Sequence, residues 1–379
     1  MSKTASKPGK GQSGSQRYDI HWRGQAADYV TGLSWTSGGE FLAIASASGE
    51  VFLWSESGRS EAGCSESGRF ESGLLELRSH SNEQSINCLG FSADGTYLAA
   101  AGQQGAVFIW RMDRLAEAPT VLENSHCWVD QLAWHPAQPW LAFGVNSQVK
   151  VWDVARGQLL TEQDFGASSV LGLAWHPGGE LLAVSGHTGV KVWNTNDWAA
   201  APDWVEVPGA SLSVAWSGEG EYLASGNLDR TLTVVRWGEP PPWLMQGFPG
   251  KVRKVAWQSA ADRDVSGEGE PLLAAACMEG VTVWRRQGKG WKSEVLAGHE
   301  GTVGAIAFHP DRALLASAAE DGRVCIWEDG RSLGPVLKGA RGVANLAWHP
   351  QGQQLAAGGA QGEVLIWKAS RRGTGFKKR

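Results

Sequence analysis

Histidine and cysteine are the side chains of this chain that could bind a metal or act as a nucleophile. Four histidines precede proline, and these are His135, His176, His309 and His349. A metal ion needs several nitrogen ligands at about 2.0–2.1 Å. The four histidines lie in corresponding turns of separate repeating units, so we interpret them as turn residues rather than metal ligands.

The adjacent His126 and Cys127 could form a base and a nucleophile. No third residue is placed to support the pair, so the favoured interpretation of Cys127 is a structural thiol. The chain also lacks the GxxxxGK[ST], HExxH and GxSxG motifs, and it has no GxGxxG motif between a strand and a helix. We therefore expect no enzyme, with no catalytic residue, no metal and no cofactor.

The composition is that of a globular chain with a packed core. Of the 379 residues, 42% are apolar and 19% are charged. No apolar run reaches the length of about 18 residues that spans a bilayer, so no membrane insertion is expected. Residues 1–16 lack the apolar stretch of a secretory signal. The five cysteines are scattered without a CxxC pair, which favours free thiols in a cytoplasmic chain.

Tryptophan is unusually frequent, and its positions are periodic. Seven of the 21 tryptophans end short runs typical of β-strands, and these are Trp54, Trp110, Trp152, Trp193, Trp284, Trp327 and Trp367. The long interval after Trp193 contains one more such run, in which Val235 stands at the Trp position. A period of about 40–45 residues indicates a repeat architecture, and the chain contains eight such units.

Each unit contains the same series of runs. In the third unit they are Val129 to Trp134, Leu141-Ala142 and Val149 to Trp152, followed by a less regular fourth run. Alternation of apolar and polar residues with period two predicts strands. Each unit is therefore predicted to be a four-stranded antiparallel sheet, with the tryptophans that end the first and third strands packed between sheets.

This pattern resembles the WD40-repeat (WD-repeat) β-propeller family over residues 18–368. The best match to the motif is Gly298-His299, Ser317, Asp321 and Trp327, and only Trp152-Asp153 keeps the dipeptide. The resemblance implies an all-β, eight-bladed WD40 propeller that serves as a non-enzymatic scaffold for protein–protein interaction. It also implies a buried hydrogen-bonded tetrad of His299, Ser317, Asp321 and Trp327. The fifth unit keeps Ser225 and Asp229 but lacks the Trp.

A ring of sheets needs closure, because open edges invite association. The run Tyr18 to Arg23 has no unit of its own, and we expect it to pair with the third strand of the last unit, Glu363 to Trp367. The predicted organisation is a disordered basic tail at 1–17, one propeller at 18–368 with a low-complexity loop at 55–73, and a basic C-terminal tail at 369–379.

Two insertions and two basic tails interrupt the pattern. The insertions, Ser55 to Gly73 and Gln258 to Pro271, are either solvated loops or docking segments. Residues 1–17 and 368–379 contain basic residues and no acids, whereas the whole chain has a net charge of −5. A nucleic-acid-associated scaffold that uses these tails is one alternative function, although solubilising ends are the favoured interpretation of the tails.

The upper face of the propeller carries the predicted binding residues. We define this face by the connections between the second and third strands and between the fourth strand and the next unit. In the family these positions contact partners. The predicted protein- or peptide-binding residues are Tyr29, Trp128, Val145, Leu171, Leu212, Leu228, Lys251, Arg253 and Met278. They form an apolar arc with an aromatic anchor and a cationic end, although some of them could pack into neighbouring loops instead.

A second alternative is an eight-bladed propeller enzyme of the quinone-cofactor dehydrogenase type, which also repeats tryptophan once per blade. Such an enzyme needs a Ca²⁺ site of clustered carboxylates in the central funnel. The funnel-facing positions predicted here are mostly small or apolar, which favours the scaffold over the enzyme.

Overall fold

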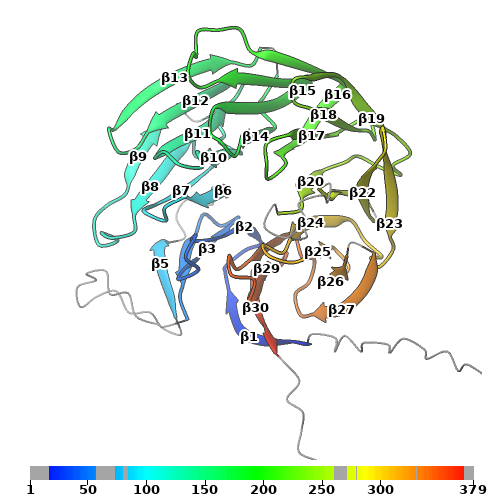
Figure 1. The fold of residues 1–379 in the computed structure, drawn as a ribbon. Helices are drawn as coiled ribbons and strands as arrows, with labels where there is room; N and C mark the ends of the chain where they lie inside the picture. Colours follow the sequence, from blue (N-terminus) through cyan, green and yellow to red (C-terminus); the bar gives the residue numbers. More distant parts are fainter. Residues whose placement is uncertain are drawn as a thin grey trace, which may run out of the picture.

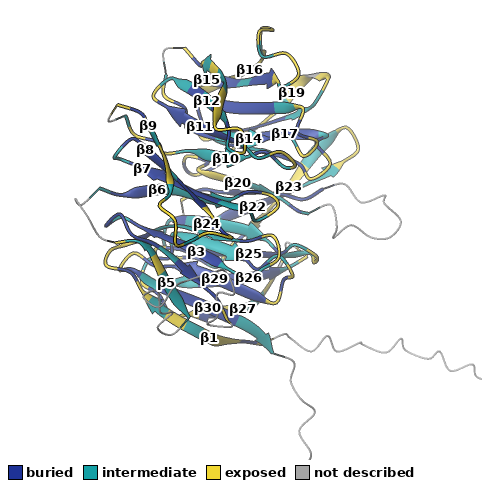
Figure 2. Ribbon diagram, turned by 90° about the vertical axis from the view of Figure 1, so that its left-hand side faces the viewer, coloured by how far each residue is buried: buried dark blue, intermediate teal, exposed yellow. Residues whose placement is uncertain are grey.

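All regular elements of the described chain are β-strands, and they form sheets that follow one another around a central axis in chain order (Figure 1). The computed structural model describes residues 17–56, 73–79, 84–125, 127–166, 168–259, 271–278, 280–329 and 331–370. Buried residues lie mainly in the strands, and exposed residues lie in the connections (Figure 2). The prediction of an all-β fold is therefore confirmed.

Six of the seven sheets have four antiparallel strands. The first three are β2 (Val30–Trp35), β3 (Leu42–Ser46), β4 (Val51–Trp54) and β5 (Leu74–Arg78); β6 (Ile86–Phe91), β7 (Tyr97–Gly102), β8 (Ala106–Arg111) and β9 (Thr120–Glu123); and β10 (Leu132–Trp134), β11 (Trp140–Val145), β12 (Gln148–Asp153) and β13 (Gln158–Asp164). The next two along the chain after the six-stranded sheet are β20 (Lys254–Trp257), β21 (Leu273–Ala276), β22 (Val281–Gln287) and β23 (Gly290–Leu296); and β24 (Val303–Phe308), β25 (Leu314–Ala319), β26 (Arg323–Glu328) and β27 (Ser332–Lys338).

The last four-stranded sheet joins both ends of the described chain. It contains β28 (Asn345–Trp348), β29 (Gln354–Gly358), β30 (Glu363–Ser370) and β1 (Arg17–Gln25). The seventh sheet has six strands, β14 (Gly172–Trp175), β15 (Leu181–Asn194), β16 (Asp203–Trp216), β17 (Tyr222–Asn227), β18 (Leu232–Arg236) and β19 (Glu239–Met245).

The six-stranded sheet contains the residues of two predicted units. The first half of β15 pairs with β14 and its second half pairs with β16. In the same way, β16 pairs with β15 through residues 203–210 and with β17 through residues 211–216. Two long continuous strands thus replace the turns that separate strands elsewhere.

The innermost strands support a count of eight units. They contact one another in the closed order β2, β6, β10, β14, β16, β20, β24, β28 and back to β2. The sheets themselves number seven because β16 is shared. Eight blades therefore stay a prediction, with this inner ring as its support.

Tryptophan at the end of the first strand links six of the eight predicted units to the unit before it. The indole N–H donates to a main-chain carbonyl of the preceding unit's first strand. The six hydrogen bonds are Trp35–Ala347 (3.2 Å), Trp134–Gly90 (2.8 Å), Trp175–Ala133 (3.0 Å), Trp216–Ala174 (3.2 Å), Trp257–Ala215 (3.0 Å) and Trp348–Ala307 (3.1 Å). A buried indole N–H needs a partner, and here the partner fixes the spacing between neighbouring sheets.

The four His-Pro histidines link the same neighbours through their turns. Each Nε2 lies 3.1–3.2 Å from the carbonyl oxygen of a glycine in the following unit, and these glycines are Gly179, Gly220, Gly352 and Gly39. Each Nδ1 accepts an amide N–H from its own turn. In His135, His309 and His349 both ring nitrogens are engaged in this way, so Nε2–H is the donor and the ring is neutral. His176 Nδ1 also lies 2.8 Å from Glu180 Oε1. Burial lowers the pKa of His135, His309 and His349 below the ordinary value.

Strand β1 closes the ring by pairing with β30 from Arg17↔Ser370 to Gln25↔Glu363 (Figure 1). The expected pairing of Tyr18 to Arg23 with Glu363 to Trp367 is present. The predicted boundaries at 17/18 and 368/369 stay a prediction; in the structure, Arg17, Ala369 and Ser370 belong to the paired strands. Residues 1–16, 57–72 and 371–379 lie outside the described residues, and with them most of the tails and of the 55–73 loop.

In the seventh unit, the four residues of the predicted tetrad lie within contact of one another. Trp327 Nε1–H donates to Ser317 Oγ (2.8 Å), and Ser317 Oγ lies 2.7 Å from His299 Nε2. His299 Nδ1 lies 3.4 Å from Asp321 Oδ2. One tautomer satisfies the set: Ser317 O–H donates to Nε2, and Nδ1–H donates to the carboxylate.

Asp321 is also held by the backbone. It accepts the amide N–H groups of Glu300 and Arg323, both at 2.9 Å. Burial acts to raise the pKa of Asp321, but these amides and His299 outweigh it, so the pKa lies below its ordinary value. The carboxylate therefore stays ionised and ties the connection before β24 to the turn before β26.

The fifth unit replaces the tetrad with a hydroxyl and amide network. Ser225 Oγ lies 2.7 Å from Ser211 Oγ and donates to Asn227 Oδ1. Asn227 Nδ2 donates to Thr231 and Thr233, at 2.9 and 3.0 Å. Asp229 is exposed and accepts only the Thr231 hydroxyl among the described contacts. These hydrogen bonds replace those of the tetrad, and Trp237 packs against the cluster that contains Trp216.

Deletion of residues 1–24 should lower the melting temperature strongly, because it removes β1 and exposes the edge of β30. Deletion of residues 1–15 should change it little, because β1 begins at Arg17. Differential scanning calorimetry of the two truncated chains beside the full chain measures this. Equal melting temperatures for the two truncations would contradict closure by β1.

Asp321→Ala should destabilise the fold by about 1–3 kcal/mol, since it leaves buried donors unpaired. Asp229→Ala is the matched control. It should lower the free energy of unfolding less, because Asp229 is exposed and its unit lacks the tryptophan of the tetrad. Urea unfolding of both variants gives the two free energies. If the variants unfold at the same urea concentration, the network around Asp321 does not stabilise the seventh unit.

The His-Pro turns should make stability fall on mild acidification. Because burial lowers the native pKa of His309, the unfolded chain binds a proton first, near the ordinary pKa of about 6.5. The contribution of the His309 turn to the free energy of unfolding is therefore complete above that pH and is lost as the pH falls below it. The loss of unfolding free energy between pH 7.5 and 5.5 should be smaller in His309→Gln than in the unchanged chain. The same pH dependence in both would exclude this role.

Candidate functional site

The upper rim is built by a repeated hydrogen bond that brings connections of adjacent units together. The amide of the first apolar residue in a first strand donates to the loop between the second and third strands of the preceding unit. Val252 N–H donates to Asn227 O (3.1 Å), and Val303 N–H donates to Met278 O (2.8 Å). Side chains that flank these residues therefore gather at one mouth of the ring.

Large apolar side chains at this mouth are exposed. Trp128 is 58% exposed and Met278 is 50% exposed, and Tyr29 and Leu228 are exposed as well. The Met278 side chain lies over Gly250, where a Cβ atom would be 2.4 Å from Met278 Cγ. Gly250 thus gives Met278 its place beside the start of the sixth unit's inner strand.

Three other predicted apolar residues are less accessible. Val145 is only 6% exposed and packs in the cluster that contains Val129 and Phe143, so little of its side chain is available to a partner and its contact role stays a prediction. The cause is its position at the end of β11, where it is directed into the interface between sheets. Leu171 and Leu212 are half-buried and contribute only part of their surfaces to the rim.

The cationic end of the arc has three residues rather than the two predicted. Lys251 and Arg253 are exposed, and so is Lys254 at the start of β20. Burial among protein atoms lowers the pKa of Lys254, although its side chain is accessible to water. No acid of the described residues forms an ion pair with any of the three within 4.0 Å.

An acidic residue lies elsewhere on the same mouth. Asp130 is exposed on the third unit and accepts a hydrogen bond from Asn87 of the second. The basic side chains belong to the sixth unit and Trp128 belongs to the third. The upper mouth therefore combines an aromatic side chain and a carboxylate on one part of the ring with a cluster of cations on another.

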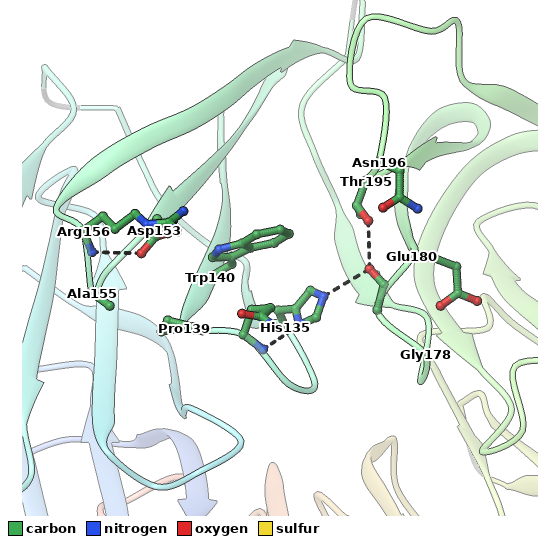
Figure 3. A pocket seen from close by; sticks show the side chains of 12 residues that line it. His135, Pro139, Trp140, Asp153, Ala155, Arg156, Gly178, Glu180, Thr195 and Asn196 are labelled. Carbon is green, nitrogen blue, oxygen red and sulfur yellow. Dashed lines mark hydrogen bonds and ion pairs between the residues drawn. The ribbon is translucent and has the colours of Figure 1, made fainter.

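The lower face contains a polar pocket of about 580 Å³ between the third and fourth units (Figure 3). His135 borders it, with Nε2 3.1 Å from Gly179 O, and Thr195 Oγ1–H donates to the same carbonyl at 3.1 Å. Asp153 accepts the Arg156 amide and forms an ion pair with its side chain at 3.5 Å. These hydrogen bonds are structural, and they leave His135 no free nitrogen to act as a base or a ligand.

The thiols are unreactive where burial is strong. Cys88, Cys127, Cys277 and Cys325 are free. Burial raises the pKa of Cys325 to about 11 and also raises that of Cys88 and Cys277. Cys127 Sγ accepts a hydrogen bond from Asn146, and its neighbour His126 lies outside the described residues.

Neither a metal-binding cluster of His, Cys, Asp or Glu nor a membrane-spanning helix is found in the described part of the chain. No three or more His, Cys, Asp or Glu residues lie together there. The Ca²⁺ site that a propeller dehydrogenase needs thus has no candidate ligand set in these ranges. The described residues contain no helix that is long and apolar enough to cross a bilayer.

A family model described as "WD domain, G-beta repeat" matches the chain seven times. The matched residues are 17–55, 72–111, 119–153, 158–194, 208–235, 290–328 and 332–368. Between the fifth and sixth matches, residues 236–289 stay unmatched, and they contain β20, β21 and β22 of the predicted sixth unit. That unit carries the 258–271 insertion and the cationic inner strand, so its departure from the repeat pattern is consistent with eight units.

Curated relatives of the chain are similar over part of their length. It is 25% identical to the transcriptional corepressor LEUNIG_HOMOLOG of Arabidopsis thaliana over 279 residues, which are 64% of this chain and 35% of that protein. It is 31% identical to the nuclear distribution protein nudF of Aspergillus flavus over 28% of this chain and 22% of that protein.

A third relative is the small ribosomal subunit protein RACK1 of Candida albicans. It is 30% identical over 20% of this chain and 24% of that protein. The chain thus spans about a third or less of the curated relatives that it matches. The family model covers most of the chain, and the sheets have the four-stranded antiparallel form that the repeat predicts; the chain therefore belongs to the WD40-repeat family of β-propeller proteins.

Proposed function

We propose that this protein is a non-enzymatic scaffold that binds a protein segment on the upper mouth of its propeller. The observation that carries the proposal is the exposed set of Trp128, Tyr29, Leu228 and Met278 on one rim. Aromatic side chains and methionine are enriched where proteins meet, and they dominate binding energy when a partner covers them. The free thiols favour action in the cytoplasm.

The charges at the mouth support a partner with an acidic group. Lys251, Arg253 and Lys254 lie together on the sixth unit without a described ion-pair partner. A partner with an apolar pocket for the Trp128 ring and with a carboxylate that faces the three cations would contact both ends of the mouth. We therefore expect the bound segment to carry an apolar patch and a separate acidic or C-terminal carboxylate.

The relatives support a role in assemblies rather than in catalysis. One is named as a transcriptional corepressor and another as a small ribosomal subunit protein, and both names describe proteins that work with other macromolecules. The nucleic-acid alternative depended on the basic tails, and residues 1–16 and 371–379 lie outside the described residues. The described rim favours a protein partner, because it exposes large apolar side chains such as Trp128 and Met278 beside its charged residues.

Trp128→Ala and Arg253→Glu should each abolish capture of the native partner and leave the melting temperature nearly unchanged, as surface substitutions usually do. Affinity capture from a lysate of the source cells, with quantitative mass spectrometry, identifies proteins that the unchanged chain retains. The expected loss for either variant is at least about tenfold, which corresponds to about 1.4 kcal/mol.

Matched substitutions on outer strands serve as controls. Leu333→Ala removes an exposed apolar side chain from β27, and Lys292→Glu reverses an exposed charge on β23. Both should retain the partner. Arg156→Glu changes the lower-face pocket, where the Arg156 side chain is 71% exposed. If Arg156→Glu loses the partner and Trp128→Ala keeps it, the lower face is the binding surface.

A further inference from the structure

Basic side chains lie at the start of the first strand in the sixth unit and at this place in no other unit. Lys251 and Arg253 flank the first apolar residue, Val252, and Lys254 follows them. In the other seven units, the only charged residue at the three corresponding positions is Asp130. We refer to Lys251, Arg253 and Lys254 as the cationic cluster, and in a chain with a net charge of −5 it is a local exception.

The backbone holds this segment from both sides. The Val252 amide donates to Asn227 O of the fifth unit at 3.1 Å, and the Val252 side chain is fully buried. The Arg253 amide donates to Ala276 O, at the end of the sixth unit's second strand, at 3.0 Å. Because the backbone of the cationic cluster is fixed before a ligand arrives, little of its conformational entropy is lost on binding.

The described protein does not neutralise the charge of the cationic cluster. Lys251, Arg253 and Lys254 are all exposed, and among the described residues no acid pairs with them within 4.0 Å. Burial among protein atoms lowers the pKa of Lys254, so its ammonium has lost part of its hydration. An anion that reaches this ammonium would replace the lost hydration with a charge-assisted hydrogen bond.

Small residues and two exposed apolar side chains surround the cationic cluster. The neighbouring strand β24 carries Gly304 and Ala305 at the positions that correspond to Arg253 and Lys254, so no long side chain stands there. Leu228 follows Asn227 and is 40% exposed, and Met278 is 50% exposed and lies over Gly250. An anionic group can therefore approach the cations while its apolar neighbour contacts Leu228 and Met278.

A phosphate group matches three cations better than a carboxylate does. A phosphorylated serine or threonine carries about −1.5 to −2 charges at pH 7 and three acceptor oxygens, whereas a carboxylate has one charge and two oxygens. A guanidinium such as that of Arg253 can donate two parallel hydrogen bonds to a phosphate. A nucleic acid would need cations along its path, but the same mouth carries Asp130 and Trp128. The charge pattern therefore favours a single phosphorylated side chain.

We infer that Lys251, Arg253 and Lys254 bind a phosphorylated serine or threonine of the partner segment. An apolar residue beside the phosphorylated one contacts Leu228 and Met278. This inference rests on the function proposed above, and it makes the partner's acidic group at these cations a phosphate rather than a carboxylate. Binding of the partner would then be created by a kinase and removed by a phosphatase.

A degenerate peptide library tests the cationic cluster before the partner is known. Each bead displays one peptide Gly-X-X-X-phosphoserine-X-X-X-Gly, in which X is any amino acid except cysteine, and matched libraries have serine or glutamate at the central position. The fluorescently labelled full chain is added, and bright beads are counted. The phosphoserine library should give at least about tenfold more of them than either other library. Equal counts for phosphoserine and glutamate, or no bright beads, would overturn the inference.

Charge reversal in the protein tests the same site. Lys251→Glu with Arg253→Glu should weaken the tightest selected phosphopeptide at least about tenfold, measured by fluorescence anisotropy. Lys289→Glu with Lys292→Glu is the matched control, because both lysines are exposed, at or just before β23, and the change in net charge is the same. Lys251→Gln with Arg253→Gln is a milder pair if charge reversal unfolds the chain. Unchanged binding by a folded variant of the cationic cluster would refute the site.

Competition separates the possible sources of the phosphate. Inorganic phosphate lacks the apolar neighbour, so it should displace the selected phosphopeptide at least about tenfold less well than the unlabelled phosphopeptide does. A short single-stranded DNA should also be at least about tenfold weaker at an equal concentration of phosphate groups. Equal displacement by either competitor would mean a site for a free anion or for nucleic acid, and the proposal would be wrong.

The proposed function can hold while this inference fails, and the two outcomes differ. Loss of partner capture by Trp128→Ala supports the upper mouth as the binding surface. If that loss is seen while the unchanged chain prefers the glutamate library, the partner carries a carboxylate and phosphate recognition is wrong.

Discussion

The hydrogen bond from each first-strand indole to the preceding sheet is the interaction on which this structure depends. Flat apolar sheet faces could slide past one another, since the hydrophobic effect has no direction. The indole N–H removes that freedom because it must find an acceptor when it is buried. Six tryptophans, from Trp35 to Trp348, select the same carbonyl position of the neighbouring unit.

The histidine turns begin directly after these tryptophans, at the same end of the first strands. His135, for example, follows Trp134 directly and reaches Gly179 of the next unit, while Trp134 itself reaches back to Gly90. One short Trp-His-Pro segment therefore connects three consecutive units. A repeat array in which each unit contacts only its neighbours gains cooperativity from such links.

Where the repeat departs from its pattern, the surface acquires chemistry that the regular units lack. The fifth unit exchanges Trp for Val235, and a network of Ser225, Asn227 and two threonines replaces the polar contacts of the tetrad. The sixth unit carries Lys251, Arg253 and Lys254 at its first strand and gains a cationic cluster at the upper mouth.

The sequence by itself determined the strands, their order and the closing strand, because apolar periodicity and tryptophan spacing are local properties of the chain. It also identified Trp128 as a side chain not required in the core. Only the tertiary structure decided which rim residues meet solvent: Val145 and Trp128 both flank the third unit's loops, yet one is buried and the other exposed. The burial of Lys254 also needed the tertiary structure, because the atoms that desolvate a side chain come from neighbouring strands that the local sequence does not identify.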